Sequence, residues 1–229
     1  MTIPKIIHQT WKDDQVPAHF QPFVNSWKEH HPDWEYHLWT DEMNEGFIKE
    51  HYADFLEIYQ KYSSNIQRVD AVRYFILHKI GGLYVDLDFF CFRNVMPLLE
   101  GADSVFGEEH EEHCIPHQKE IIISNALMAS IPQSKFMEEI CMELYQPSLD
   151  YENKNEMVLE TTGPFMLTRM YMGQNYSPGQ VKIVDSSVFY PLTKNELDTM
   201  EGIVTSDELI NKKLSKAYAI HCYWGSWWK

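Results

Sequence analysis

Residues 64 to 88 constrain the fold of this chain more than any other segment. Ser64 followed by Gln67 is typical of a capping box at the start of a helix, and apolar residues recur at helical spacing after it. Gly81-Gly82 then ends the predicted helix, because glycine readily adopts the left-handed conformation found at helix ends. Residues 83 to 87 alternate with a period of two and predict a strand. A helix, a tight turn and a buried strand in this order are typical of an α/β protein.

The rest of the chain alternates short apolar segments with helical patterns, which also favours an α/β fold and a single domain over residues 1–229. The chain lacks repeats and any linker rich enough in Gly, Ser or Pro to divide it. Strands are predicted at 3–11, 34–39, 104–106, 121–128, 181–184 and 217–223, and helices at 20–31, 47–62, 135–145 and 164–172.

The charge balance restricts the partners. With 34 acidic against 19 basic residues the formal net charge is −15, and such a surface repels nucleic acid. Divalent cations, which bind carboxylate oxygens, are compatible with it. The start of the chain has no signal-peptide pattern, and no apolar run reaches the length of a membrane span. The four cysteines are scattered and are expected to be reduced thiols. We therefore expect a cytoplasmic protein, with peripheral contact to the cytoplasmic face of a membrane through its acceptor.

The predicted strand at residues 83 to 88 carries two carboxylates on one face. Leu83, Val85 and Leu87 point to one side, and Tyr84, Asp86 and Asp88 point to the other. Asp86 and Asp88 thus converge at the carboxyl end of a buried strand, where α/β sheets place their ligands. Two neighbouring carboxylates are costly to desolvate unless a cation lies between them. The pattern predicts a metal site with Mg²⁺ or Mn²⁺, which favour oxygen ligands.

The preceding helix carries a second charged pair. Asp70 and Arg73 are three residues apart, so they share a helix face. On an exposed face such a pair contributes little. Asp70, however, lies in a largely apolar stretch, and a buried pair is expected where a ligand such as a sugar needs polar groups.

Several ordered motifs resemble a known family. The residues Ile3-Pro4-Lys5-Ile6-Ile7-His8-Gln9-Thr10-Trp11, Asp70-Ala71-Val72-Arg73-Tyr74 and Gly81-Gly82-Leu83-Tyr84-Val85-Asp86-Leu87-Asp88 closely resemble the family 32 glycosyltransferases, whose sugar-binding region contains a DXD motif. Ser124-Asn125-Ala126, Thr162-Gly163-Pro164 and His221 with Gly225-Ser226-Trp227 extend the resemblance over essentially the whole chain. It implies a GT-A-like fold with a mixed, mostly parallel central sheet flanked by helices.

The resemblance also implies a function and a set of site residues. It implies a hexosyltransferase, regarded as retaining, that uses Mn²⁺ or Mg²⁺, a UDP- or GDP-sugar donor and a glycan or glycolipid acceptor, as in polysaccharide biosynthesis. By this resemblance Asp70, Arg73, Asp86 and Asn125 are the candidate catalytic residues. His8, Gln9, Trp11, Tyr84, Ser226 and Trp227 are expected, with Asp70, Arg73 and Asp86, to bind the donor. Asp86, Asp88 and His221 are the candidate metal ligands.

Trp11 and His221 have ordinary alternatives. Trp11 is our candidate for stacking on the nucleotide base, although a tryptophan is as readily a core residue. His221 can complete a metal shell as a neutral imidazole, or it can be a hydrogen-bonded core histidine.

Three other interpretations stay open. His110, His113 and His117, within an acidic stretch, suit a Zn²⁺ site if helical, but we favour a solvated loop that can close over donor or acceptor. A metal-dependent phosphohydrolase also uses paired aspartates. The haloacid dehalogenase-type motif of such enzymes, however, calls for Thr or Val two residues after the second aspartate, and Phe90 stands there. A non-catalytic nucleotide-sugar or glycan-binding module would not need both Asp86 and Asp88.

Overall fold

The computed structural model describes residues 1–146, 151–200, 203 and 205–224. Its centre is a six-stranded sheet in the order β2-β1-β3-β6-β5-β7, in which β6 is antiparallel to both of its neighbours and the other pairs are parallel. These strands are β1 (Ile6–Thr10), β2 (Glu35–Trp39), β3 (Gly82–Val85), β5 (Ser104–Glu108), β6 (Ile123–Ser130) and β7 (Val181–Val184). A small antiparallel sheet pairs β4 (Phe89–Cys91) with β8 (Ala219–His221).

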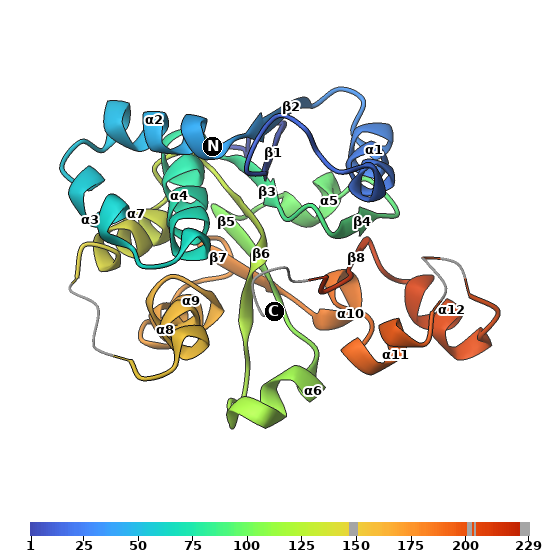
Figure 1. Ribbon diagram of the computed structural model, residues 1–229. Helices are drawn as coiled ribbons and strands as arrows, with labels where there is room; N and C mark the ends of the chain where they lie inside the picture. The colour runs from blue at the N-terminus through green and yellow to red at the C-terminus, as the bar shows by residue number, and fades with distance from the viewer. Residues whose placement is uncertain (147–150, 201–202, 204, 225–229) are drawn as a thin grey trace.

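Helices flank the central sheet, as the resemblance implies (Figure 1). The longer ones are α1 (Gln21–His30), α2 (Asp41–His51), α3 (Leu56–Lys61), α4 (Asn65–Lys79), α7 (Lys135–Glu143), α8 (Lys154–Thr161), α9 (Pro164–Met172) and α12 (Glu208–Leu214). Shorter ones are α5 (Met96–Leu99), α6 (Glu111–Cys114), α10 (Ser186–Phe189) and α11 (Lys194–Asp198), with 3₁₀ turns at Ala18–Phe20 and Ile115–His117. The mixed α/β fold class is confirmed.

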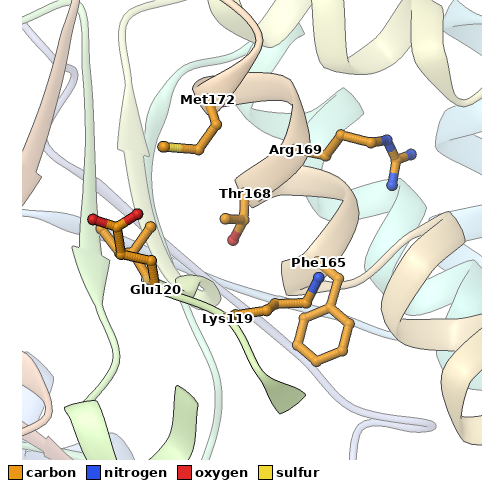
Figure 2. Close-up of a pocket in the computed structure, with 7 residues that line it drawn as sticks. Lys119, Glu120, Phe165, Thr168, Arg169 and Met172 are labelled. Atoms are coloured by element: carbon orange, nitrogen blue, oxygen red, sulfur yellow. The ribbon is translucent and has the colours of Figure 1, made fainter. Parts of the chain in front are cut away.

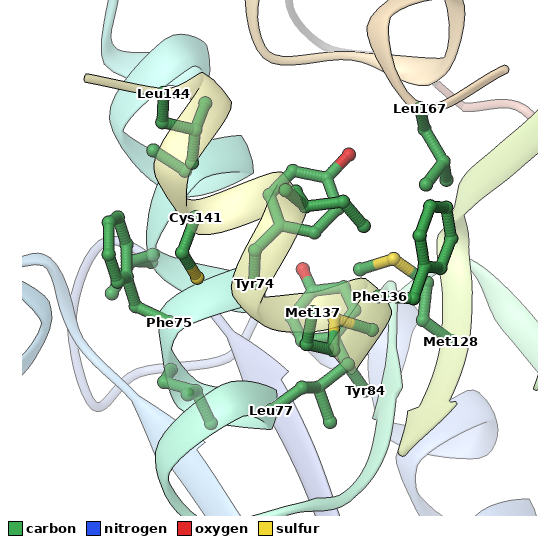
Figure 3. Packing of buried hydrophobic residues seen from close by; sticks show 14 of the residues in the cluster. Tyr74, Phe75, Leu77, Tyr84, Met128, Phe136, Met137, Cys141, Leu144 and Leu167 are labelled. Atoms are coloured by element: carbon green, nitrogen blue, oxygen red, sulfur yellow. The ribbon is translucent and has the colours of Figure 1, made fainter. Parts of the chain in front are cut away.

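Strand β3 separates two hydrophobic cores. Leu83 and Val85 pack with Trp27 of α1 on one face, whereas Tyr84 packs on the other with α4 and α7. Figure 3 shows this second core, in which side chains of α4 meet those of α7 above the sheet. The alternation predicted for residues 83 to 85 is therefore confirmed. Because every residue of β3 is buried, the chain that follows it is held rigidly in place.

Two expectations about helices are wrong. Residues 47–62 do not form one helix, since α2 ends at His51 and α3 begins at Leu56. Tyr52 leaves the helical region because its ring packs on Phe75 at 4.5 Å and its hydroxyl contacts His78 at 2.7 Å. Ser64 does precede α4, but its side chain makes no capping hydrogen bond. The glycine end of α4 is confirmed, with positive φ at both Gly81 and Gly82.

Gly82 allows β3 to enter the sheet beside β1. Its φ is +102°, and a Cβ there would lie 2.7 Å from the Ile6 carbonyl oxygen and 3.1 Å from Nε2 of His8. Backbone atoms of a paired strand cannot give way easily, so a side chain at this position would push the two strands apart. The glycine turn therefore fixes where the carboxyl end of β3 lies.

We predict that Gly82→Ala lowers the free energy of unfolding by about 2–4 kcal/mol. Alanine would have to adopt a positive φ at this position, and its Cβ would overlap the Ile6 carbonyl oxygen. Urea unfolding followed by circular dichroism measures this. Gly46→Ala is the matched control: Gly46 lies in α2 with no atom within 4 Å of an added Cβ, so alanine should stabilise the helix by up to about 1 kcal/mol. Equal effects of the two variants would contradict the account of the turn.

Candidate active site

A large cavity of about 1650 Å³ opens beyond the carboxyl end of β3. Residues from each of the predicted motifs line this one space, among them Trp11, Asp70, Arg73, Asp86, Asp88, Ser124, Asn125, Pro164 and His221. A much smaller cavity of about 160 Å³ lies beside α9 (Figure 2) and shares only Phe165 with the lining of the large one. The two basic side chains at the small cavity are already paired, since Lys119 and Arg169 both contact Glu160. The candidate site is therefore the large cavity.

A buried charge network crosses the floor of this cavity. The guanidinium of Arg73 lies 3.1 Å from Oδ1 of Asp70 and 3.4 Å from Oδ1 of Asp86. Arg73 is 2% exposed and Asp70 5%, so the predicted Asp70–Arg73 pair is a buried one rather than a surface pair. Arg73 also donates to the carbonyl oxygen of Asn125 at 2.9 Å. One arginine thus joins α4, the end of β3 and β6.

Asp70 is held from two more directions. The Asn125 amide donates to its Oδ1 at 3.0 Å and the Thr162 hydroxyl to its Oδ2 at 3.2 Å. The sequence places Thr162 in the motif at residues 162–164 but did not predict it as a site residue. Its neighbour Gly163 would bring a Cβ within 3.0 Å of the Leu159 backbone, so the glycine allows the close turn that presents Thr162.

Asp86 is positioned by residues of β1 and β3. The Tyr84 hydroxyl donates to Oδ1 of Asp86 at 2.7 Å and contacts the Thr10 hydroxyl at 2.9 Å. The Gln9 amide donates to the Asp86 carbonyl oxygen at 3.3 Å, while Tyr36 donates to the side-chain oxygen of Gln9 at 2.8 Å. Tyr84 and Gln9 are both fully buried. They act on Asp86 from behind the cavity wall.

Asp88 and His221 form the other half of the floor. Nε2 of His221 lies 3.1 Å from Oδ1 of Asp88, and the Trp224 backbone N–H donates to Oδ2 of Asp88 at 2.9 Å. The His221 ring stacks on Phe89 with centroids 4.7 Å apart. Asp86, Asp88 and His221 each offer one atom within 4.8 Å of the others, which fits a divalent cation with two oxygen ligands and one nitrogen ligand. Strand β8 supplies the histidine because it pairs with β4, which directly follows Asp88.

Burial sets the pKa values of these carboxyls. Burial raises the pKa of Asp70 to about 7 even though Arg73 favours its ionised form, and burial also raises the pKa of Asp86. Burial alone would raise the pKa of Asp88, but the adjacent His221 ring outweighs it and lowers the pKa. His221 shows the reverse: burial opposes protonation, and Asp88 raises the pKa. A carboxylate pair with opposed shifts in one buried site is typical of functional positions.

Three predicted donor residues at the end of β1 occupy different surroundings. Trp11 lines the cavity, packs edge-on against Phe20 at 5.4 Å, and its Nε1 lacks a hydrogen-bond partner in the described chain. Gln9 acts through Asp86, as above. His8 is fully buried and lies behind the lining: it accepts from Trp39 Nε1 at 3.0 Å and its Nε2 lies 2.9 Å from the Gly81 carbonyl. The predicted Ser226 and Trp227 lie outside the described residues.

The histidine-rich stretch is a short helix rather than an open loop. Helix α6 begins after His110, whose ring accepts from the Glu112 N–H at 3.3 Å. Within the residues described, the group able to hold a metal ion is Asp86, Asp88 and His221, and it includes none of His110, His113 and His117. The Zn²⁺ interpretation of this stretch therefore has no support in the geometry.

Comparison with known proteins agrees with the motifs. A family model described as "glycosyltransferase sugar-binding region containing DXD motif" matches residues 17–105. Inositol phosphoceramide mannosyltransferase 1 of Schizosaccharomyces pombe is 34% identical over 191 residues, 82% of this chain and 57% of that protein. Mannosyl phosphorylinositol ceramide synthase SUR1 of Saccharomyces cerevisiae is 37% identical over 166 residues, 72% of this chain and 41% of that protein.

The chain belongs to this family of glycosyltransferases with a DXD-containing sugar-binding region, as the motifs indicated. The solved PaToxG glycosyltransferase shares the fold, with a TM-score of 0.52 at 18% identity, covering 75% of this chain and 69% of that one. The GT-A-like fold is thereby confirmed. The chain spans about half the length of the curated relatives it matches.

The pH dependence of stability tests whether His8 is buried and neutral behind the cavity wall. Burial lowers the pKa of His8 to about 4, so the folded protein keeps the ring neutral where the unfolded chain protonates it, near pH 6.5. Its contribution to stability is complete above pH 6.5 and is lost as the pH falls towards 4. We predict that, between pH 7 and pH 4, the free energy of unfolding falls by about 3 kcal/mol more in the wild-type protein than in His8→Gln.

Urea unfolding at a series of pH values measures this difference. His51→Gln, at an exposed residue of α2, is the control and should keep the wild-type pH dependence. Parallel pH profiles for the wild type and His8→Gln would contradict the buried, neutral state of His8.

Proposed function

We propose that this protein is a metal-dependent hexosyltransferase that moves a sugar from a UDP- or GDP-sugar to a glycan or glycolipid acceptor. The observation that carries the proposal is that Asp86, Asp88 and His221 meet on the floor of the cavity directly beside the buried Asp70–Arg73 pair. A nucleotide sugar needs both features, because its diphosphate requires a cation and its sugar hydroxyls require fixed polar groups.

The sugar end of the donor is proposed to lie over Asp70, Arg73 and Asn125. All three line the cavity, and their mutual hydrogen bonds leave little freedom to reorient. Carboxylate and amide groups that are already oriented can distinguish individual hydroxyls, because a mismatched sugar leaves a buried polar group without a partner. We therefore propose that this group selects the donor sugar and orients its anomeric carbon.

The nucleotide end is proposed to lie towards Trp11, with Mn²⁺ or Mg²⁺ held by Asp86, Asp88 and His221. Such a cation, when bound, neutralises the charge that develops on the departing diphosphate. Tyr84 and Gln9 hold the side chain and backbone of Asp86 in place for that purpose. Retention of configuration is our expectation from the family resemblance.

The acceptor is proposed to be a glycolipid. The two relatives compared above are named for mannosyl transfer involving inositol phosphoceramide, so mannose is the first donor sugar to test and an inositol-containing lipid the first acceptor. In the part of the chain that the structure describes, every helix is too short or too polar to cross a membrane. We propose that the protein works in the cytoplasm, at the membrane surface where such an acceptor lies.

We predict that Asp88→Ala lowers Mn²⁺-dependent hydrolysis of the donor sugar by about 100-fold or more while the protein stays folded, because the developing diphosphate charge is no longer neutralised. The measurement is release of free sugar by NMR, with circular dichroism as the check on folding. Asp14→Ala, at an exposed residue outside the cavity lining, is the control.

Full activity in a folded Asp88→Ala protein would contradict the proposal. Phosphate release without sugar release in the wild type would favour the phosphohydrolase, and donor binding without turnover would favour the binding module.

A further inference from the structure

A second group of polar side chains lies on the far side of Asp88, and it shares only His221 with the donor and cation site placed above. It consists of Glu109, His113, Tyr190, His221 and Tyr223, which we call the Glu109 cluster. Glu109 directly follows β5, His113 lies in α6 and Tyr190 directly follows α10. His221 is the last residue of β8, and Tyr223 follows two residues later. Four of them line the large cavity, and Tyr190 lies behind them.

The cluster is closely packed. The ring centroid of Tyr223 lies 4.1 Å from that of His221 and 4.7 Å from that of His113, and Tyr190 lies 5.9 Å from His221. Nδ1 of His113 is 3.3 Å from Oε2 of Glu109. Burial raises the pKa of Tyr190 and of Tyr223 well above the usual range, and the charge of Glu109 adds to both shifts. His113 contacts both the Glu109 carboxylate and the Tyr223 ring, so Glu109 and Tyr223 belong to the same part of the cavity wall.

Some polar atoms in this volume lack partners. Within the described residues, the hydroxyls of Tyr190 and Tyr223 and Nδ1 of His221 are buried without a hydrogen-bond partner. Tyr190 is only 1% exposed. A buried polar atom without a partner is unfavourable, and the Tyr223 hydroxyl, in a residue on the same cavity wall as Glu109, indicates a place that can receive hydroxyl groups.

The order of contacts along the floor separates this place from the donor. Asp70 contacts Arg73, and Arg73 contacts Asp86. Asp88, two residues after Asp86, contacts His221. The His221 ring contacts the Tyr223 ring, which in turn contacts the His113 ring. His113 then contacts the Glu109 carboxylate. If the donor sugar lies at the Asp70 end and the diphosphate at Asp88, the Glu109 end is left for the second substrate.

The backbone around Glu109 is well anchored. The Glu109 N–H donates to the Ile122 carbonyl at 2.8 Å, just past the irregular step in the pairing of β5 with β6. The Lys194 N–H donates to Nε2 of His113 at 3.3 Å, which leaves the proton on Nδ1 and facing Glu109. Gly107 makes room for Tyr190, whose Cε2 would lie 2.7 Å from an added Cβ.

We propose that the Glu109 cluster is the acceptor subsite, and that Glu109 accepts a hydrogen bond from a hydroxyl of a polyol acceptor while the Tyr223 hydroxyl binds a neighbouring hydroxyl. Tyr190 packs behind these residues against the His221 ring. The proposal rests on the proposed function, since it assigns the second substrate of the same cavity. It makes Glu109 and Tyr223 the residues that determine which acceptor is used.

The test compares Glu109→Gln and Tyr223→Phe in the full chain with the wild type. Soluble acceptor probes are myo-inositol and methyl α-D-mannopyranoside, offered with GDP-mannose or UDP-glucose and Mn²⁺, and the readout is the ratio of transfer product to hydrolysed donor. Each variant is expected to lower this ratio, Glu109→Gln by about 10- to 100-fold, because a hydrogen bond to a charged group is lost. Glu111→Gln removes the same charge from an exposed residue outside the lining and should keep the wild-type ratio.

Binding of the two polyols, followed by saturation-transfer NMR with Mn²⁺ and nucleoside diphosphate, provides a readout that does not need turnover. Weaker polyol binding by Glu109→Gln and by Tyr223→Phe, but not by Glu111→Gln, would support the subsite. It would do so even if the wild type hydrolysed neither donor, because that outcome refutes only the transferase proposal. Wild-type transfer ratios and binding in both cluster variants, or a wild-type protein that binds neither polyol, would overturn the subsite.

Discussion

The buried contact of Arg73 with Asp70 and Asp86 is the interaction on which the rest of this structure depends. On the floor of the cavity the Arg73 guanidinium lies 3.1 Å from the Asp70 carboxylate and 3.4 Å from that of Asp86. The side chains of Arg73 and Asp70 are almost out of reach of water, whereas that of Asp86 is 28% exposed. Removing one partner of such a group leaves an uncompensated buried charge, which costs about 3–5 kcal/mol. Hydrophobic side chains of the same volume would be less costly, so the network is better explained by binding than by stability. It also joins α4, β3 and β6, which are distant in the sequence, at one point.

The position of this network follows from the glycine turn that precedes β3. Gly81 and Gly82 end α4 and let β3 pair directly with β1, so that both aspartates emerge at the carboxyl end of a buried strand. The side chains behind the wall, Tyr84 and Gln9, then orient Asp86. Strand β8 returns along β4 and brings His221 to Asp88. A single rigid strand therefore places the contacts of Arg73 with Asp70 and Asp86 beside the contact of Asp88 with His221 on the cavity floor.

The parts of the fold and site that could be predicted from the sequence are those set by local spacing. The alternation of residues 83 to 85, the i, i+3 spacing of Asp70 and Arg73 and the strand at Val181–Val184 are examples. The strand predicted over residues 83 to 87 was too long, since β3 ends at Val85 and Leu87 lines the cavity together with Asp86 and Asp88. Helix 47–62 was wrongly predicted because Tyr52 is held by residues of α4, which no local pattern reveals. Thr10 and Thr162 escaped prediction as site residues because they reach Tyr84 and Asp70 across 74 and 92 positions of sequence. The Glu109 cluster is likewise brought together only by folding, and of its residues Glu109 and His113 belong to the stretch that was predicted to be an acidic, solvated loop.

The central claim is that the cavity binds a nucleotide sugar by means of a divalent cation. Saturation-transfer NMR with a panel of UDP- and GDP-sugars, first with Mn²⁺ and then with EDTA, tests it most directly. The account predicts that at least one nucleotide sugar binds with Mn²⁺, that its sugar protons receive saturation, and that EDTA abolishes the signal. Binding that is unchanged by EDTA, or no binding of any nucleotide sugar with Mn²⁺ present, would contradict it.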